Sequence, residues 1–401
     1  MAEQQTPSPT RGNRSSRSRS PSALISNQPP QNTTATTFTT PLEAADQNDV
    51  RRQVRTTNSQ SFGHRFYTSN ELTCQWVRQS PDGSDSTFDG DTASSTASVS
   101  SSILEYRTIQ GRTYHSEKHD TQYFTPNDDR QSESLDIVHH YLTLLLDGKL
   151  HLAPIKPDVQ KVVDIGTGDG IWAIDFGDEH PDAEVIGTDL SAMQPNWVPP
   201  NVKFEIDDAT QPWTWPEHTL DFVHIRFLNG AIKDWHALFR EAYRCCKPGG
   251  YVESGEFDPR YYCDDGTADG VDVIETWNSV FEMGAQKLGY SFTVIEDNLQ
   301  ETGISNAGFQ DINVVAYKAP VGAWAKDQKL AEIGRFTQLT LENDMEGYTL
   351  FLWTNVLGWP KDEYQIFLMS MRKVLRNTAN IHIYCKYKYV YGCKPVDRAA
   401  S

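Results

Sequence analysis

The sequence predicts an α/β fold in which a seven-stranded, mostly parallel sheet is covered by helices on both faces, the doubly wound arrangement. After Pro157, short apolar stretches alternate with amphipathic stretches of helical period, as in chains that build parallel sheets. The first apolar stretch runs into a glycine-rich turn, DIGTGDG (residues 164–170), at a place where such sheets bind ligands. With 401 residues, the chain has room for one such domain with insertions.

The amino-terminal quarter differs in composition from the rest. Residues 1–102 are rich in Ser, Thr, Gln, Asn and Pro and have no periodic apolar pattern, so we expect a disordered tail. Four arginines among the serines, at positions 11, 14, 17 and 19, are typical of a solvated tail, and a nuclear-import or phosphorylated segment is the alternative. The folded domain is expected over residues 103–395, with a short tail at 396–401.

The folded domain is expected to begin with a helix over residues 132–146. Apolar residues recur there at helical spacing, and Gly148 closes the pattern. These residues are Leu135, Val138, Tyr141, Leu142 and Leu145. His139 and His140 also lie on this helix, but adjacent helical positions point in different directions, so no metal site is predicted.

The sheet is expected to contain five parallel strands and two later ones. The five are residues 161–165, 184–188, 202–206, 221–225 and 250–254, and the later two are residues 310–317 and 381–390. Helices are expected to begin near Gly170 and near Trp235. Residues 325–378 read as helices interrupted by Gly347, Gly358 and Pro360, and we expect this insertion to cap the site.

The turn after the first strand favours a ligand with a cationic amino group. Gly166, Gly168 and Gly170 allow a tight turn and a close approach of the main chain, and the next helix begins with exposed amide donors. A dinucleotide fingerprint needs its third glycine at the position of Ile171, which disfavours NAD or FAD. Asp164 would repel phosphates and attract an amino group. The turn therefore suits a ligand with an amino-acid moiety.

Acidic residues follow the next two strands. Asp189 ends the second strand, where a carboxylate accepts hydrogen bonds from the two ribose hydroxyls in several nucleoside-binding folds. Asp207 and Asp208 end the third strand, where a side chain can accept a hydrogen bond from an adenine amino group. Because the carboxyl ends of parallel strands meet at one sheet edge, these acids predict a nucleoside site.

These motifs resemble those of class I S-adenosylmethionine-dependent methyltransferases: DIGTGDG, the acid in VIGTDLS, FEIDDA and KPGGYVE. More narrowly, GRTYH, GIWAIDFGDEHPDAEVIGTDLSAMQP, VPPNVKFEIDDATQPWTW and YVYGCKP resemble the LaeA-like fungal methyltransferases, over about residues 104–395. That family includes regulators of secondary metabolism and enzymes that methylate products of biosynthetic clusters. Asp169 departs from the pattern, because such proteins commonly carry Thr or Ser there.

The resemblance implies S-adenosylmethionine as the cofactor and assigns residues to its parts. Asp164 and the three glycines would hold the methionine portion, Asp189 the ribose, and Asp208 with Ala209 the adenine. Tyr114, in GRTYH, would close over the cofactor from the lead-in segment, and an ordinary packing tyrosine is the alternative.

A base is needed only when the acceptor must lose a proton. His224 is the main candidate because its ordinary pKa lies near neutrality. Strand alternation places His224 and Arg226 on one face, so a buried His224, hydrogen-bonded beneath a helix, is the alternative. Glu253 and Glu256, on the fifth strand, are further candidates. No metal is required for the reaction.

Composition argues against several other classes of protein. The net charge of −18 and the pI near 5.0 disfavour nucleic-acid binding. No apolar run is long enough to span a bilayer, and the amino terminus lacks a secretory segment, so we expect a cytoplasmic or nuclear protein. The six cysteines lack the spacing of a disulfide framework or a metal site, so reduced thiols are expected.

Two functions remain open. One is an enzyme that methylates O or N of a small secondary metabolite, held by aromatic residues in or beside the insertion: Trp324, Phe336, Tyr348, Phe351, Trp353 and Trp359. Packing inside the insertion is the alternative role of these aromatics. The other function is a LaeA-like regulator that binds the cofactor and acts with partner proteins in the nucleus. A nicotinamide-dependent oxidoreductase is disfavoured by the glycine spacing.

Overall fold

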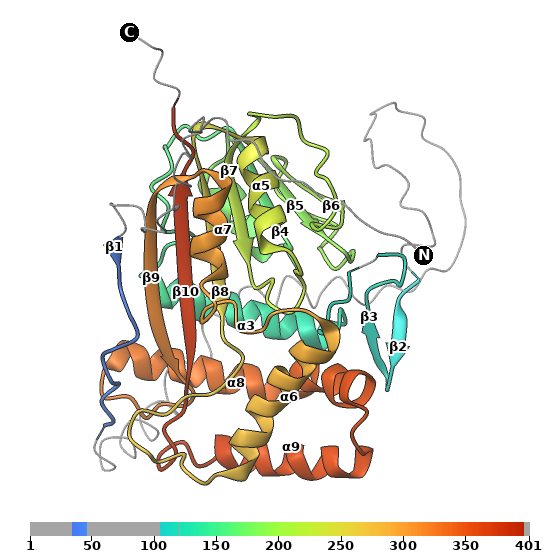
Figure 1. Ribbon diagram of the computed structural model, residues 1–401, viewed down its shortest axis with the longest axis vertical. Coiled ribbons are helices and arrows are strands. Elements are labelled where there is room, and N and C mark those ends of the chain that lie inside the picture. Colours follow the sequence, from blue (N-terminus) through green and yellow to red (C-terminus); the bar gives the residue numbers. More distant parts are fainter. Residues whose placement is uncertain (1–33, 46–104, 120, 397–401) are drawn as a thin grey trace, which may run out of the picture. The chain divides into compact units, whose positions relative to one another are not determined.

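The computed structural model of the chain describes residues 34–45, 105–119 and 121–396. Its centre is a sheet with the strand order β1-β9-β10-β8-β7-β4-β5-β6 (Figure 1). The seven long strands are β4 (Lys161–Ile165), β5 (Glu184–Asp189), β6 (Val202–Ile206), β7 (Leu220–Arg226), β8 (Cys246–Phe257), β9 (Gln310–Pro320) and β10 (Tyr384–Cys393).

The long strands run parallel except for β10, which is antiparallel to both of its neighbours, β8 and β9. The predicted seven-stranded, mostly parallel sheet is therefore confirmed. Strand order reverses at β4, which has β5 on one side and β7 on the other. In sheets of this kind the crevice outside such a switch point binds the ligand, and the glycine turn follows β4 directly.

Helices cover both faces of the sheet because successive strand residues point to opposite sides. Val162 and Phe222 share a buried cluster with Trp172, which belongs to the helix on one face. Val163 and Phe239 share a second cluster on the other face. The helices concerned are α4 (Ile171–Glu179) on the first face, and α5 (Trp235–Cys245) with α7 (Leu299–Ala307) on the second.

The remaining helices form the cap, which Figure 1 shows grouped at one end of the sheet. They are α6 (Asp272–Leu288), α8 (Gln328–Phe351), the π-helical segment η1 (Leu352–Leu357) and α9 (Lys361–Leu375), and they share a core with α3 (Asp129–Leu145). The sequence placed capping helices only at residues 325–378, but α6, between β8 and β9, joins them.

Breaks in the cap occur at two of the three predicted places. Gly358, with φ +70°, ends η1, and Pro360 precedes α9. The third break lies at Asp344, whose φ of −140° interrupts α8, and not at Gly347. The Asp344 carboxylate accepts the amide N–H of Gly347 at 3.0 Å, so it starts the second half of the helix as an N-cap does.

Residues 34–45, which composition assigns to the tail, lie against the edge of the sheet. β1 (Thr34–Ala35) pairs in parallel with β9, and the Ala45 N–H donates to the Trp324 carbonyl at 2.8 Å. Edge pairing uses backbone groups, so composition gives little sign of it. The rest of the predicted 1–102 tail, with its four arginines, and residues 397–401 lie outside the described residues.

No helix in the described ranges has the length and hydropathy to cross a membrane. Within the same ranges, no three His, Cys, Asp or Glu side chains are grouped so as to hold a metal ion.

Candidate functional site

A cavity lies at the carboxyl ends of β4, β5, β6 and β7. One wall comes from the glycine turn and the acids at the ends of β5 and β6. Another comes from residues 115, 121, 123 and 125–127 of the lead-in segment. Among the residues that the sequence predicted for cofactor binding, those in the lining are Gly166, Gly168, Asp189, Asp207, Asp208 and Ala209.

The turn after β4 accepts only glycine at two positions for steric reasons. Gly166 and Gly170 have φ values of +70° and +84°, in the left-handed region that side chains disfavour. A Cβ atom on Gly166 would collide with Leu228, and one on Gly170 with the ring of Phe204. Gly166 therefore keeps the turn close to the cavity, whereas Gly170, outside the lining, lets α4 pack against β6.

Asp164 supports the turn from behind and is not in the cavity lining. It lies opposite His224 in the β4–β7 pairing, so both side chains point to the same face of the sheet. One carboxylate oxygen accepts the Nδ1–H of His224 at 2.7 Å, and the other accepts the hydroxyl of Thr167 at 2.6 Å. Both oxygens are thus already engaged within the protein.

His224, the candidate base, also lies outside the cavity lining. Its ring is stacked on Trp172 of α4, with centroids 3.7 Å apart, and is 1% exposed. Burial lowers the pKa of His224 to about 4, although the hydrogen bond to Asp164 opposes this shift. His224 is therefore neutral at pH 7, and it orients Asp164 beneath the glycine turn.

Asp189 connects the glycine turn to the segment after β5. Its two carboxylate oxygens accept the N–H groups of Gly168 at 2.9 Å and Ser191 at 3.0 Å. Burial raises the pKa of Asp189 to about 6. Each oxygen retains a lone pair, so the carboxylate can still accept hydrogen bonds from a ligand's hydroxyl groups.

The two acids after β6 differ in how much of their hydrogen-bonding capacity remains. Asp208 is buried and accepts the hydroxyls of Thr121 at 2.9 Å and Thr210 at 2.7 Å. From the described part of the chain, Asp207 accepts only the Asp208 N–H, at 2.9 Å, and burial raises the pKa of Asp207. Asp207 therefore has more capacity left to contact a ligand.

Tyr114 and His115, next to each other at the end of β3 (Arg112–Tyr114), have opposite surroundings. Tyr114 is fully buried against Phe351, with ring centroids 5.5 Å apart, and is not in the cavity lining. His115 lines the cavity, as alternation along an extended chain requires. The hairpin of β2 (Arg107–Ile109) and β3 thus brings His115, and the segment that follows, to the site.

Comparisons with known proteins agree with this geometry. A family described as a methyltransferase domain matches residues 137–309. Methyltransferase pytC of Aspergillus terreus is 37% identical, over 76% of this chain and 93% of that protein. The chain belongs to this fungal S-adenosylmethionine-dependent methyltransferase family. The secondary metabolism regulator LAE1 of Cochliobolus heterostrophus is 32% identical, over 68% of this chain and 92% of that protein.

A third relative is named for the methylation of a protein. The protein-methionine methyltransferase laeA of Emericella nidulans is 27% identical, over 70% of this chain and 74% of that protein. The family therefore includes proteins named as methyltransferases and proteins named as regulators.

The cavity of the methyltransferase fits S-adenosylmethionine. The glycine turn leaves room for close approach, and Asp189 keeps acceptor capacity for hydroxyl groups. Asp169, in the turn itself, lines the cavity with a buried carboxylate oxygen that has no hydrogen-bond partner. A buried polar atom without a partner in a cavity wall is typical of a ligand site. The contact that each residue makes with the cofactor stays a prediction.

A second, smaller cavity of the methyltransferase is aromatic. It is enclosed by α3, α6, α8 and the ends of β8 and β10. Its lining consists of Tyr141, Phe227, Phe257, Pro259, Tyr261, Trp277, Phe281, Val321, Thr337, Thr340, Leu341, Tyr348, Cys385 and Tyr387. None of these carries a charged side chain. Of the six aromatics that the sequence suggested for an acceptor pocket, Tyr348 alone appears in this described lining.

Phe227 lines both cavities of the methyltransferase, so they meet at this residue. Its φ of +60° lies in the left-handed region, which costs a bulky residue about 1–2 kcal/mol. The backbone is held there by a hydrogen bond from the Phe227 N–H to the Gly255 carbonyl at 3.0 Å. Strain of this kind collects at functional positions.

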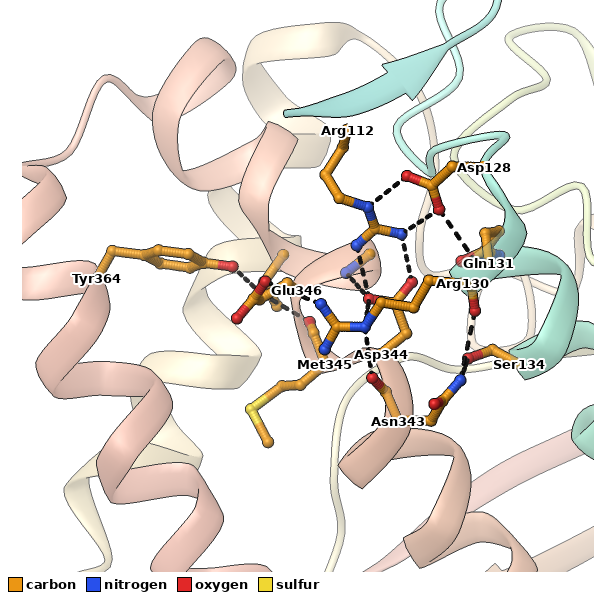
Figure 2. Close-up of polar contacts among 12 residues, drawn as sticks. Arg112, Asp128, Arg130, Gln131, Ser134, Asn343, Asp344, Met345, Glu346 and Tyr364 are labelled. Carbon is orange, nitrogen blue, oxygen red and sulfur yellow. Dashed lines mark hydrogen bonds and ion pairs between the residues drawn. The ribbon is translucent and has the colours of Figure 1, made fainter. Parts of the chain in front are cut away.

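Figure 2 shows an ion-pair cluster centred on the buried side chains of Arg112 and Asp344. Arg112 of β3 donates to both oxygens of Asp344 in α8, each at 2.7 Å, and to Asp128, the N-cap of α3. Asp344 is fully buried, and Arg130 lies 3.4 Å from it. We call Arg112, Asp128, Arg130 and Asp344 the Arg112 cluster. It fixes the lead-in hairpin to the helix that covers the aromatic cavity.

Proposed function

We propose that the methyltransferase transfers a methyl group to an O or N atom of a small, uncharged, largely apolar acceptor bound in the aromatic cavity. The observation that carries the proposal is the position of this cavity, which meets the cofactor cavity at Phe227 and has no charged side chain in its lining. Apolar, aromatic linings with a few polar groups are typical of small-molecule sites. A secondary metabolite has this chemistry.

S-adenosylmethionine supplies an electrophilic methyl group on a sulfonium. The protein contributes orientation and the exclusion of water, since a well-aligned pair of reactants gains roughly 7–11 kcal/mol over free reactants. Residues 115, 121, 123 and 125–127 line the cofactor cavity, and Phe227 lines both cavities. The acceptor atom would therefore approach past Phe227.

The aromatic cavity offers hydrogen bonds and no base. The hydroxyls of Tyr141 and Tyr387 lie 2.9 Å apart, and burial raises the pKa of both above the ordinary range. Both stay neutral at pH 7 and can position a polar group of the acceptor. The acceptor atom is then expected to be a neutral nitrogen or a hydroxyl acidic enough to ionise by itself.

The test is a panel of phenols, enols and aromatic amines, incubated with the full chain and S-adenosylmethionine while S-adenosylhomocysteine formation is followed. Each compound is paired with an analogue that carries a carboxylate or sulfonate. Turnover that favours the uncharged member of each pair supports the proposal. Turnover that favours the charged members contradicts it.

A second candidate function is regulation of secondary metabolism, favoured by the likeness to LAE1 and laeA. In this function the acceptor would be a protein side chain or a partner complex, and the location would be nuclear. Removing residues 1–33 separates the candidates, since it deletes the serine–arginine segment and leaves the residues that contact β9. Undiminished methylation of a small molecule would favour the enzyme. Loss of nuclear entry and partner binding, without any small-molecule turnover, would favour the regulator.

A further inference from the structure

Two charged side chains in the cofactor cavity, Asp169 and Arg226, form no salt bridge with any residue that the structure describes. Asp169 is 8% exposed, and one of its oxygens accepts the Ile171 N–H at 3.2 Å. Its other oxygen is buried and makes no hydrogen bond with the residues that the structure describes. Leaving a buried carboxylate oxygen without a partner is costly, so a donor from a ligand is expected there.

Arg226, at the end of β7, has the opposite charge to Asp169 and also forms no salt bridge with the described residues. Arg226 is one of the residues that line the cofactor cavity. Both terminal nitrogens of Arg226 lie 3.4 Å from Nδ1 of His139. His139 in turn donates from Nε2 to Asp175 at 2.9 Å, and burial lowers the pKa of His139, so its ring is neutral. His139 therefore positions Arg226 without neutralising it.

We infer that Asp169 and Arg226 bind the two charged groups of the cofactor's methionine moiety, Asp169 the ammonium and Arg226 the carboxylate. The inference rests on the assignment of S-adenosylmethionine to this cavity and deepens it. It also replaces Asp164, whose oxygens are engaged by His224 and Thr167, as the partner of the amino group. A zwitterion offers a positive group to Asp169 and a negative group to Arg226. An uncharged or purely anionic ligand does not offer both.

The test compares two ligands that differ only in this moiety. S-adenosylhomocysteine carries the amino acid, whereas 5′-methylthioadenosine lacks it. With the full chain, Asp169→Asn and Arg226→Gln are each expected to weaken S-adenosylhomocysteine binding at least about tenfold and to leave the affinity for 5′-methylthioadenosine within about twofold. Asp178→Asn, an exposed acid on α4, is the matched control and should change neither affinity.

Calorimetry gives each affinity, and thermal unfolding confirms that the variants fold. Equal weakening of both ligands, or of neither, would overturn the inference and leave the cofactor assignment intact. An unsubstituted chain that binds neither ligand would contradict the cofactor assignment itself, and the inference with it.

The pH dependence of S-adenosylhomocysteine affinity gives a second test, because a purely structural role of Asp169 would not produce one. Burial and the neighbouring Asp136 of α3 raise the pKa of Asp169 to about 7, while Arg226 opposes this shift and Asp164 adds to it. Asp169 is therefore partly protonated at pH 7 in the free protein, and a bound ammonium favours its ionised form. Affinity for S-adenosylhomocysteine should rise severalfold from about pH 6.5 to 8. Asp169→Asn should abolish that rise, and a variant that keeps it would contradict the inference.

Discussion

The two cavities of the methyltransferase are built from different kinds of sequence signal. The cofactor cavity takes its glycines and acids from short segments at the ends of the successive strands β4, β5 and β6, within residues 166–209. The aromatic cavity takes its lining from segments between Tyr141 and Tyr387 that meet only in the folded chain, and none of its residues is charged. We assign the first cavity to the charged cofactor and propose the second for an apolar acceptor.

Substituting Arg112 tests whether the two cavities keep their structures independently of each other. Arg112→Met leaves the fully buried Asp344 without its bidentate partner, and breaking a buried pair costs about 3–5 kcal/mol. Urea unfolding should show this loss. Both S-adenosylhomocysteine binding and turnover should fall, because the cluster fixes walls of both cavities. Arg240→Met, which breaks an exposed pair with Asp234, should cost less than about 1 kcal/mol. A small effect of Arg112→Met on binding and turnover would show that each cavity keeps its structure without the cluster.

Gly166→Ala is expected to damage the cofactor cavity specifically. The new Cβ is strained by the positive φ, for about 1–2 kcal/mol, and its collision with Leu228 adds about 1–3 kcal/mol. S-adenosylhomocysteine binding by calorimetry should be lost. Gly148→Ala is the control, since Gly148 has φ +84° but open space around it, and it should cost only the strain. Retained binding in Gly166→Ala would contradict the role of this turn.

Asp189→Ala tests the nucleoside end of the same cavity. Losing a charged acceptor is expected to cost about 1.5–3 kcal/mol of S-adenosylhomocysteine affinity, roughly 10- to 150-fold. The exposed Asp182, in the turn before β5, gives the matched control Asp182→Ala. Calorimetry that shows no difference between the two variants would refute the ribose assignment.

Glu256, near the end of β8, should make the free energy of unfolding depend on pH. Its carboxylate accepts the N–H groups of Leu228 and Asn229, each at 3.0 Å, and burial raises its pKa to about 8. A group whose folded pKa is raised stabilises the fold at low pH, and this contribution is lost as pH rises through the folded value. The free energy of unfolding should therefore fall by about 1.4 kcal/mol from pH 7 to 9. Glu256→Gln should remove this fall, and an equal fall in that variant would assign it to another group.

Tyr387→Phe should produce the smallest effect, confined to the aromatic cavity. It removes one hydroxyl of the Tyr141–Tyr387 pair, worth about 0.5–1.5 kcal/mol. The KM for the acceptor should rise about two- to tenfold, while S-adenosylhomocysteine affinity stays unchanged. Tyr391→Phe, on the same strand but outside the lining, is the control. Altered cofactor affinity in Tyr387→Phe would contradict the separate roles of the two cavities.

The contrast between the cavities also explains what the sequence could predict. The sheet and the acids at its carboxyl edge follow from local periodicity and glycine spacing, and the structure brings Asp189, Asp207 and Asp208 together as expected. The side to which a strand residue points depends on its neighbours, so the positions of Asp164 and His224 behind the turn needed the β4–β7 register. For the same reason the sequence assigned Tyr114 to the cofactor, whereas its neighbour His115 lines the cavity.

The cap and the Arg112 cluster could not be found in this way. Arg112 and Asp344 are 232 positions apart, and nothing local to either residue indicates the other. α6 joined the cap through packing that only the tertiary structure specifies.

The 232 positions between Arg112 and Asp344 affect how the chain folds during translation. The lead-in hairpin leaves the ribosome early, and Asp344 follows roughly 10–50 s later at about 5–20 residues per second. During that interval Arg112 has no buried partner in α8, so residues 115–127 lack their anchor. Nascent chains should therefore acquire affinity for S-adenosylhomocysteine only after the carboxyl-terminal third has emerged, which makes cofactor capture a reporter of completed translation.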